Sequence, residues 1–267
     1  METQRKAIAL GDFDGMHLAH KTVVTGAKNV VIYCVNNSFS LLQKSIFERR
    51  FSNAVFADFE KLRNMSGEDF INNILLDELG AQMILCGYNF RFGKNAMWSA
   101  GDLRNYLEEK DVWVRILEHL DYKGEPISSS RIRVCLKEGN MEDANEMLGY
   151  NFTFESEVIG GDERGRTIGF PTINQKLPEG LTVPKYGVYE SRAEIDGKLY
   201  KALSNIGIRP SFRLDEPICE SHIIDYNGEL YGKTVRLELI RYLREEKKFS
   251  SIDKLKEQLE YDKSSII

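Results

Sequence analysis

The sequence predicts two parts of different fold class: a parallel α/β domain over residues 1–150 and an antiparallel β-barrel with a closing helix over residues 151–267. Three observations predict this division. Short apolar stretches alternate with helical stretches in the first part, and short strands separated by turn signals dominate the second. The length of 267 residues also suits one large or two medium domains.

The first part alternates between strand and helix patterns. Short apolar stretches predict strands over 6–10, 30–35, 83–86 and 113–117. Helices are expected over 20–28, 69–79, 102–110 and 131–148, and the helical spacing of apolar residues is clearest in the second of these. This alternation is typical of a parallel sheet with helices on both faces. The joint to the second part is expected near residue 150.

The second part is rich in strand and turn patterns. A strand is expected over 152–159. Asp196-Gly197 and Asn227-Gly228 each lie between two strand-like segments, and both pairs are strong type I′ hairpin signals. We therefore expect one hairpin over 187–205 and a second over 218–242. A helix over 251–261 is expected to close the barrel.

Composition and charge exclude several classes of protein. The net charge is −5, with 18 basic against 21 acidic residues in 1–150 and 18 against 20 in the remainder, so neither part resembles a nucleic-acid binder. No apolar run approaches the roughly 18–20 residues that span a bilayer, and the N-terminus has no apolar stretch long enough for a signal peptide. Four separated cysteines without a CxxC pair predict reduced thiols, hence a cytoplasmic protein. The oligomeric state stays open.

Two histidines follow the first predicted strand, in the segment Gly11-Asp-Phe-Asp-Gly-Met-His-Leu-Ala-His20. His17 and His20 are three residues apart and share one face of the helix start. A helix N-terminus favours phosphate because its N–H groups are free and its dipole is positive. Zinc is a competing interpretation, although no cysteine or third histidine lies nearby. Two turn histidines that cap a helix are the simpler alternative.

Two further polar segments support a phosphate site in the first part. Cys86-Gly-Tyr-Asn-Phe-Arg-Phe-Gly93 follows a strand, so it lies at the edge of the sheet where open α/β folds bind ligands. Ile127-Ser-Ser-Ser-Arg-Ile-Arg133 leads into a helix, where a serine can cap and Arg133 can reach a phosphate. Plain capping and a solvated arginine are the alternatives for this second segment.

The second part carries a glycine-rich run over 160–174 that is neither a Walker A loop nor a GxGxxG fingerprint. Glycines allow the backbone to approach a ligand closely, although a glycine-rich turn without a ligand is the simpler interpretation. Thr172 and Asn174 are two apart, so both side chains point the same way on an extended segment. Their neutral oxygens suit Mg²⁺ bound together with ATP phosphates.

The motifs of the first part resemble a known family. GDFDGMHLAH resembles the signature of Rossmann-like nucleotidyltransferases, and GYNFRFG and ISSSRIR resemble paired motifs of their FAD synthetase branch. The resemblance implies that FMN attacks the α-phosphate of ATP, giving FAD and pyrophosphate, with His17 and His20 as catalytic residues. It also implies that ATP is bound in this part by Gly11, Phe13, His17, His20, Asn89, Ser129 and Arg133.

The second part resembles riboflavin kinases, through GDERGRTIGFPTIN and then through motifs in order up to the stretch Leu243-Arg-Glu-Glu-Lys-Lys-Phe249. The whole chain therefore resembles the bacterial bifunctional riboflavin kinase/FMN adenylyltransferase family. The resemblance implies that Glu220 is the base that activates riboflavin, where an exposed strand carboxylate is the alternative. It implies Mg²⁺ at Thr172 and Asn174. It implies further ligand contacts to ATP from Gly161, Gly165, Gly169, Thr172 and Asn174, and to flavin from Arg244 and Phe249.

The expected function is the conversion of riboflavin to FMN in the second part and of FMN to FAD in the first, with ATP as the second substrate of both reactions. The chain departs from the nucleotidyltransferase pattern in two places. Ala19 stands where the family signature has a glycine between the two histidines, and the loop that family members usually have after the second strand is missing after residue 35. These departures leave open a riboflavin kinase with a weak or altered N-terminal domain. A non-catalytic flavin- or nucleotide-binding regulator is the alternative from another class. His119 and His222 are expected to be structural.

Overall fold

The computed structural model describes residues 6–35, 39–161, 165, 169–208 and 216–266. Parts of the glycine-rich run over 160–174, and residues 209–215 of the region that resembles riboflavin kinases, lie outside the described residues. The chain divides into two compact units. Unit 1 contains Met1–Phe39 and Lys44–Ser129, and unit 2 contains Ser40–Gln43 and Ser130–Ile267. The units therefore divide earlier in the chain than residue 150, and the helical region that precedes this residue belongs with unit 2.

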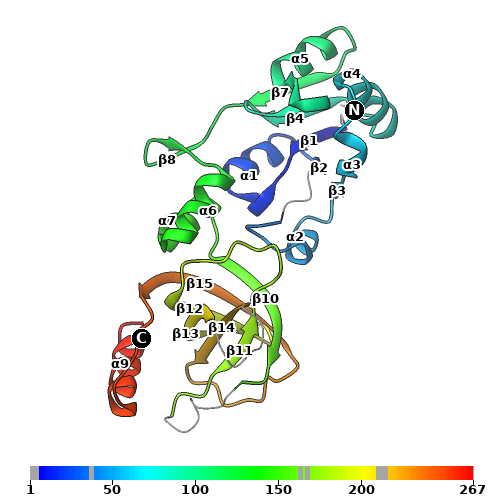
Figure 1. Cartoon of the computed structure of the whole chain (residues 1–267). Coiled ribbons are helices and arrows are strands. Elements are labelled where there is room, and N and C mark those ends of the chain that lie inside the picture. The colour runs from blue at the N-terminus through cyan, green and yellow to red at the C-terminus, as the bar shows by residue number, and fades with distance from the viewer. Residues whose placement is uncertain (1–5, 36–38, 162–164, 166–168, 209–215, 267) are drawn as a thin grey trace. The chain divides into compact units, whose positions relative to one another are not determined.

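Unit 1 is built on a parallel sheet, as predicted (Figure 1). In spatial order its described strands are β3 (Ala54–Phe56), β2 (Val31–Cys34), β1 (Ala7–Gly11), β4 (Met83–Gly87) and β7 (Trp113–Leu117). Every neighbouring pair is parallel. The central strands β1 and β4 are almost fully buried, which explains their continuous apolar sequences. The edge strand β3 was not predicted, because its three residues are too few to show a pattern.

Helices and short hairpins complete unit 1. The helices are α1 (Leu18–Val24), α2 (Lys44–Arg50), α3 (Phe59–Leu62), α4 (Gly67–Asp69), a π-helix (Phe70–Glu78) and α5 (Ala100–Glu108). The short strands are β5 (Arg91–Phe92), β6 (Trp98–Ser99), β8 (Asp121–Tyr122) and β9 (Glu125–Pro126). The prediction of a helix over 20–28 was wrong in its bounds. This helix begins earlier, at Leu18, and ends at Val24, where the Thr25 hydroxyl donates to the Lys21 carbonyl.

Unit 2 contains the predicted closed antiparallel barrel (Figure 1). Around the barrel the strands are β10 (Phe152–Ile159), β11 (Ile173–Lys176), β14 (Pro217–Ile223), β13 (Lys198–Ile208), β12 (Gly187–Ile195) and β15 (Thr234–Arg244). The first hairpin is confirmed, since β12 pairs with β13 across Asp196-Gly197, whose φ angles are 50° and 76°. The second was wrong, because β14 pairs with β11 and β13 whereas β15 pairs with β10 and β12. The segment that contains Asn227-Gly228 therefore connects strands that are not neighbours.

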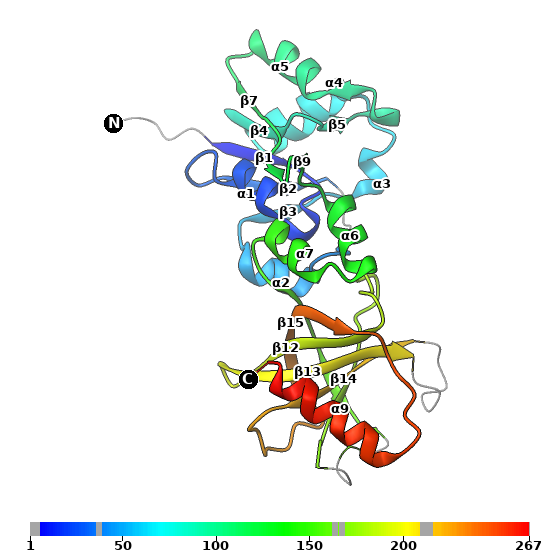
Figure 2. The same ribbon diagram turned by 90° about the vertical axis from the view of Figure 1, so that its left-hand side faces the viewer.

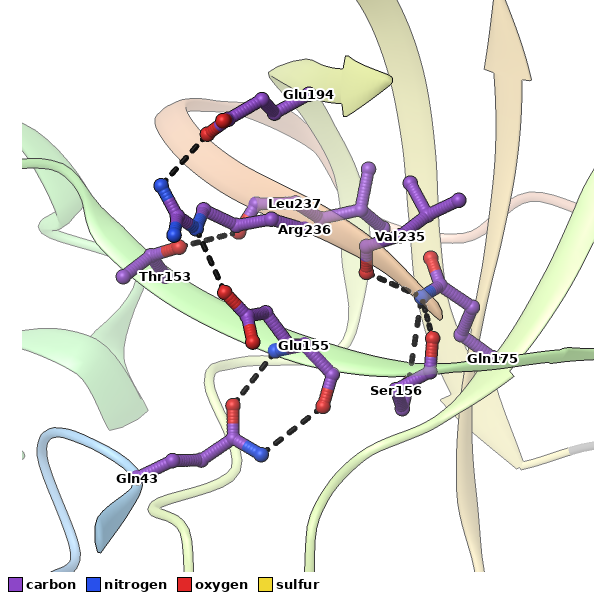
Figure 3. Close-up of polar contacts among 9 residues, drawn as sticks. All are labelled: Gln43, Thr153, Glu155, Ser156, Gln175, Glu194, Val235, Arg236 and Leu237. Carbon is purple, nitrogen blue, oxygen red and sulfur yellow. Dashed lines mark hydrogen bonds and ion pairs between the residues drawn. The ribbon is translucent and has the colours of Figure 1, made fainter. Parts of the chain in front are cut away.

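A buried glutamine helps to close the barrel where backbone pairing is short. Only two residue pairs join β10 to β11. The Gln175 side chain, which is fully buried, donates from Nε2 to the carbonyl oxygens of Ser156 (2.7 Å) and Val235 (2.8 Å), as Figure 3 shows. One amide thereby links three strands of the barrel.

Two further polar contacts hold β10 (Figure 3). The Gln43 side chain donates to the Glu155 carbonyl (2.9 Å) and accepts from the Glu155 N–H (2.6 Å), as a neighbouring strand would. The Arg236 guanidinium lies between the carboxylates of Glu155 and Glu194, at 2.9 and 2.6 Å. These contacts of Gln43, together with the hydrogen bond from the Thr182 N–H to the Ser40 carbonyl (2.7 Å), join the short segment Ser40–Gln43 to unit 2.

Among the described residues, three helices complete unit 2: α6 (Ser129–Glu138), α7 (Met141–Leu148) and α9 (Ile252–Ser264). The single helix predicted over 131–148 is thus two helices. The Asn145 side chain ties α7 to the barrel, because it donates to the Leu239 and Ile240 carbonyls and accepts from the Phe152 N–H. The closing helix is confirmed as α9, which lies beside the barrel in both views (Figures 1 and 2).

Candidate active sites

The histidine motif forms an irregular turn between β1 and α1. Phe13, Gly15 and Met16 have positive φ angles of 55°, 75° and 39°. The Phe13 ring packs tightly over Gly11, with ring atoms 3.1 to 3.4 Å from the position that a Cβ would take. His17 follows the turn and is 3% exposed. The turn therefore directs buried side chains inward at the carboxyl end of β1.

His17 and His20 form a stacked pair. Their ring centroids are 3.5 Å apart and their planes differ by 17°. His17 is the N-cap of α1, and its Nδ1 accepts from the His20 N–H at 3.3 Å. The alternative in which a histidine caps the helix is therefore confirmed for His17. Because Nδ1 accepts, a neutral His17 ring carries its proton on Nε2.

The His20 ring is enclosed by aromatic neighbours. The Phe13 ring meets it nearly edge-on, with centroids 5.4 Å apart. Burial, and then the proximity of His17, hold the pKa of His20 well below its usual value, so the ring is neutral at neutral pH. Its buried Nδ1 has no hydrogen-bond partner among the described residues. Buried polar atoms are normally paired, so this nitrogen is suited to a ligand group.

The other residues predicted for this site are only partly brought together. β1 and β4 are adjacent and parallel, so Gly11 at the end of β1 and Asn89 in the turn after β4 lie at the same edge of the sheet. Asn89 is exposed there. The Ser129 hydroxyl donates to the Asp14 carbonyl at 3.2 Å, which joins the third motif to the first. Arg133 belongs to unit 2, where its guanidinium bonds the hydroxyls of Ser40 and Ser130.

In unit 2 the predicted polar residues meet across two strands. Asn174 on β11 lies directly opposite Glu220 on β14. The Thr172 hydroxyl, just before β11, donates to Glu220 Oε1 at 2.8 Å. Thr172 and Asn174 thus share Glu220 as a neighbour, which agrees with the expectation that their side chains point the same way. Glu220 is half-buried, and it is not a freely solvated strand carboxylate.

Glycines surround this cluster. A Cβ on Gly161 would stand 2.2 Å from the Asn174 amide nitrogen. A Cβ on Gly165 would stand 2.2 Å from the Phe170 carbonyl oxygen, and Gly169 forms a turn at a φ of 85°. Side chains at the first two positions would push against the polar cluster or the backbone beside it, so these glycines keep the approach to it open.

A cavity of about 60 Å³ opens beside the cluster. It is lined by polar, apolar and aromatic residues of the barrel end: Val158, Pro171, Thr172, Ile173, Ser221, Ile223, Tyr226, Gly228, Glu229, Leu230 and Tyr231. Five of these come from the connection between β14 and β15 that was predicted as a tight hairpin. The long connection thus contributes the wall of a cavity next to Thr172.

Two residues near Glu220 were not predicted to take part. Asn205 on β13 lies directly opposite Glu220, donates to Glu246 at 2.9 Å, and has a buried Oδ1 without a partner among the described residues. His222 lies two residues beyond Glu220 on β14, and its Nδ1 is 2.9 Å from the Pro171 carbonyl oxygen. Burial, the main cause, lowers the pKa of His222. The alternation of side chains along β14 could have predicted that His222 lies on the same face as Glu220. The position of Asn205 opposite Glu220 could not be predicted, because it depends on the pairing of β13 with β14.

The two predicted flavin residues lie near α9. Arg244 forms a buried ion pair with Asp262, in which Nε and Nη2 lie 3.0 and 2.6 Å from Oδ2. Their side chains are only 14% and 4% exposed. Phe249 is half-buried in the segment before α9. A groove of about 530 Å³ lies beside the pair, lined by Arg241, Leu243, Arg244, Lys247, Gln258, Tyr261, Asp262 and Ser265.

The donor set near Glu220 can be tested for Mg²⁺. It offers a hydroxyl, an amide and a carboxylate, which are the oxygen donors that Mg²⁺ prefers. The described residues contain no group of three or more histidine, cysteine or acidic side chains that could hold a metal ion alone. An ion here would therefore need phosphate and water oxygens as well, which is usual for Mg²⁺ bound with nucleotides.

None of the described helices is long and apolar enough to cross a membrane.

Two family models match the chain. A model described as "Riboflavin kinase" matches residues 148–266, and one described as "FAD synthetase" matches residues 43–131. The first begins close to the boundary predicted near residue 150.

Curated relatives match along nearly the whole chain. The bifunctional riboflavin kinase/FMN adenylyltransferase of Bacillus subtilis is 32% identical, covering 100% of this chain and 93% of the relative. The protein of the same name from Listeria monocytogenes is 30% identical, covering 96% and 90%. A solved structure named as a macrolide-efflux protein from Streptococcus pneumoniae is 27% identical and superposes with a TM-score of 0.87, over 99% of this chain and 94% of that one.

Proposed function

This chain belongs to the bifunctional riboflavin kinase/FMN adenylyltransferase family, and we propose on that premise how its residues divide the two reactions. The chain is an enzyme that converts riboflavin to FMN and FMN to FAD. We assign the kinase reaction to residues 151–267 and the adenylyl transfer to residues 1–150. The contact that carries the kinase assignment is the hydrogen bond from Thr172 to Glu220 beside Asn174.

Glu220 acts as the general base of the kinase reaction in this proposal. Its carboxylate takes the proton from the 5′-hydroxyl of riboflavin while that oxygen attacks the γ-phosphate of ATP and ADP leaves. Thr172 and Asn174 would hold Mg²⁺, which supplies positive charge to the phosphates when it is bound. The Thr172 hydroxyl also orients one oxygen of Glu220, so the base and the metal site are aligned by a single contact.

The glycines and the cavity would hold ATP. Gly161, Gly165 and Gly169 let the backbone approach the phosphates, and the cavity beside Thr172 is lined by Tyr226 and Tyr231, which suit a flat base. The nucleotide would thus extend from the aromatic wall to the polar cluster.

The flavin would lie on the α9 side. Arg244 contributes mainly by holding Asp262, which fixes α9 next to the groove, and Phe249 offers an apolar ring before that helix.

In unit 1 we assign the adenylyl transfer to the stacked histidines. The FMN phosphate attacks the α-phosphate of ATP and pyrophosphate leaves, so the protein must orient two anions and stabilise the charge that develops. His17 would donate from Nε2 to a ligand oxygen, and the buried Nδ1 of His20, which has no partner among the described residues, is available to a ligand group. Gly11 and Phe13 shape the turn, and Asn89 and Ser129 lie on the same side of the sheet. The role that the resemblance implies for Arg133, the binding of pyrophosphate, stays a prediction, because this residue belongs to unit 2.

A cytoplasmic location is part of the proposal. Its support is that none of the four cysteines, all of which lie among the described residues, forms a disulfide, and that three of them are buried.

Two variants test the division of labour. FMN formation is measured from riboflavin, ATP and Mg²⁺, and FAD formation is measured separately from supplied FMN and ATP. Glu220→Gln should lower FMN formation about 10²- to 10⁴-fold and leave FAD formation unchanged. His20→Ala should do the reverse. If either variant lowers both reactions equally, the assignment of the two sites is wrong.

The wild-type protein provides the test against the alternatives. Accumulation of FMN without FAD would support a kinase with an altered N-terminal domain, for which Ala19 is the first residue to restore to glycine. Flavin and ATP binding without any turnover would support the non-catalytic regulator.

A further inference from the structure

His222 occupies a special place relative to the kinase cluster. Strand side chains alternate between faces, so His222 and Glu220 project from the same face of β14. Ser221, between them, pairs with Ile173, the first residue of β11. His222 therefore lies beside the segment that enters β11, which contains Pro171 and Thr172.

The hydrogen bond of His222 defines its tautomer. Nδ1 lies 2.9 Å from the Pro171 carbonyl oxygen. A carbonyl oxygen only accepts, so Nδ1 must carry the proton and donate. The imidazole ring also packs against the Phe170 ring, with centroids 4.9 Å apart.

The segment that His222 contacts needs such support. Pro171 has no N–H and cannot donate to a neighbouring strand. The paired residues of β11 begin only at Ile173, so Thr172 lies just outside the ladder. Two side chains of β14 thus hold this end of the chain: His222 at the Pro171 carbonyl and Glu220 at the Thr172 hydroxyl.

We propose that His222 is a positioning residue of the kinase reaction, which fixes the Pro171 carbonyl so that Thr172 stays on Glu220 and in place for the nucleotide phosphates. This inference rests on the proposed kinase function of unit 2. His222 needs no contact with either substrate for this role. It acts through the backbone of the residue before Thr172.

Two substitutions separate the hydrogen bond from the packing of the ring. His222→Leu keeps an apolar contact with Phe170 but has no donor. His222→Asn loses the ring, but its side-chain amide can place an N–H close to the position of Nδ1. We expect the Leu variant to raise the KM for MgATP and lower kcat of FMN formation, together by about tenfold, the equivalent of one lost hydrogen bond. The Asn variant should stay within about threefold of wild type.

Three controls accompany these variants. The KM for riboflavin and the rate of FAD formation from FMN should be unchanged, because neither depends on Thr172. His119→Leu, at an exposed histidine of unit 1, should leave FMN formation unchanged. If the Asn variant is as impaired as the Leu variant, or if the Leu variant matches wild type, the proposal is overturned. If the wild-type protein forms no FMN at all, the proposed function fails instead.

A measurement without turnover tests the same idea. The ¹⁵N chemical shifts of the His222 ring, assigned by their loss in the Asn variant, should show a protonated Nδ1 and an unprotonated Nε2. The opposite tautomer would contradict the hydrogen bond to Pro171, and with it the proposed role.

Discussion

The two candidate sites are built in different ways. In unit 2 the polar groups project from adjacent strands, so the register that places Asn174 opposite Glu220 also sets their separation. In unit 1 the histidines follow a turn with three positive φ angles, and aromatic packing around His20 holds them. Register is fixed by many backbone hydrogen bonds, whereas the turn depends on a few contacts of particular side chains.

The difference between the sites is also electrostatic. The unit 1 site contains two stacked imidazole rings, and the buried Nδ1 of His20 has no hydrogen-bond partner among the described residues. The unit 2 site contains a carboxylate that already accepts from Thr172. We infer that the first site gains hydrogen bonds mainly when its ligand arrives, and that the second is organised beforehand.

The largest effect on stability is expected from Asp262→Ala, which tests whether the two units are stable independently of each other. Asp262→Ala leaves the Arg244 guanidinium buried without its partner, which typically costs 3–5 kcal/mol. We expect unit 2 to unfold at a much lower temperature and FMN formation to be lost on warming. Both tryptophans of the chain, Trp98 and Trp113, lie in unit 1, so their fluorescence should report an almost unchanged transition for that unit.

A matched control for this variant is Glu60→Ala, which removes an exposed ion pair with Arg63. Exposed pairs contribute little, so the transition temperatures of both units should stay the same. A large fall of the tryptophan transition in Asp262→Ala would show that unit 1 depends on the barrel.

An intermediate effect is expected from two glycines of unit 1. A Cβ on Gly93, where φ is 74°, would stand 3.0 Å from the Gly67 nitrogen. A Cβ on Gly80, where φ is 59°, would meet nothing within 4 Å. Gly80→Ala should cost only backbone strain, about 1 kcal/mol. Gly93→Ala should cost about 2 kcal/mol or more, because the backbone of Gly93 (φ 74°, ψ 171°) lies in a region that essentially only glycine adopts and because of the added contact. Denaturation followed by tryptophan fluorescence measures both, and equal losses would contradict the structural reason.

The sequence predicted the barrel site better than the histidine site, for a physical reason. The period of two along a strand is simple, so Thr172 and Asn174 could be placed on one face before the fold was known. Their meeting with Glu220 required the strand order, and the sequence pattern misled us there, because Asn227-Gly228 suggested a hairpin between β14 and β15. The stacking of His17 on His20 depends on a turn whose dihedral angles no periodicity reveals.

The boundary between the two units also could not be predicted from local sequence patterns. The helix pattern over 131–148 fits either part of the chain. Tertiary contacts, among them those of Asn145 with the backbone of β15 and with Phe152, place α7 with the barrel. Such a choice depends on tertiary contacts and is invisible in local sequence.

The smallest expected effect concerns pH. The pKa of His20 is lowered in the folded protein from a usual value of 6.5, mainly by burial. The unfolded chain therefore binds a proton more readily, so the free energy of unfolding of unit 1 should fall as the pH drops below about 6.5. His20→Leu should flatten this dependence when tryptophan fluorescence is followed in urea. An unchanged slope would show that His20 is not the titrating group.

The passage of Ser40–Gln43 through unit 2 has a consequence for how the protein can be divided. A fragment that starts at Ser130 contains every barrel strand but lacks Gln43, so the N–H and carbonyl of Glu155 would lose their partners. Cutting the gene at one point therefore yields an incomplete barrel unit. Exchange of modules between relatives by a single crossover would face the same cost, unless the incoming piece brought its own substitute for this four-residue segment.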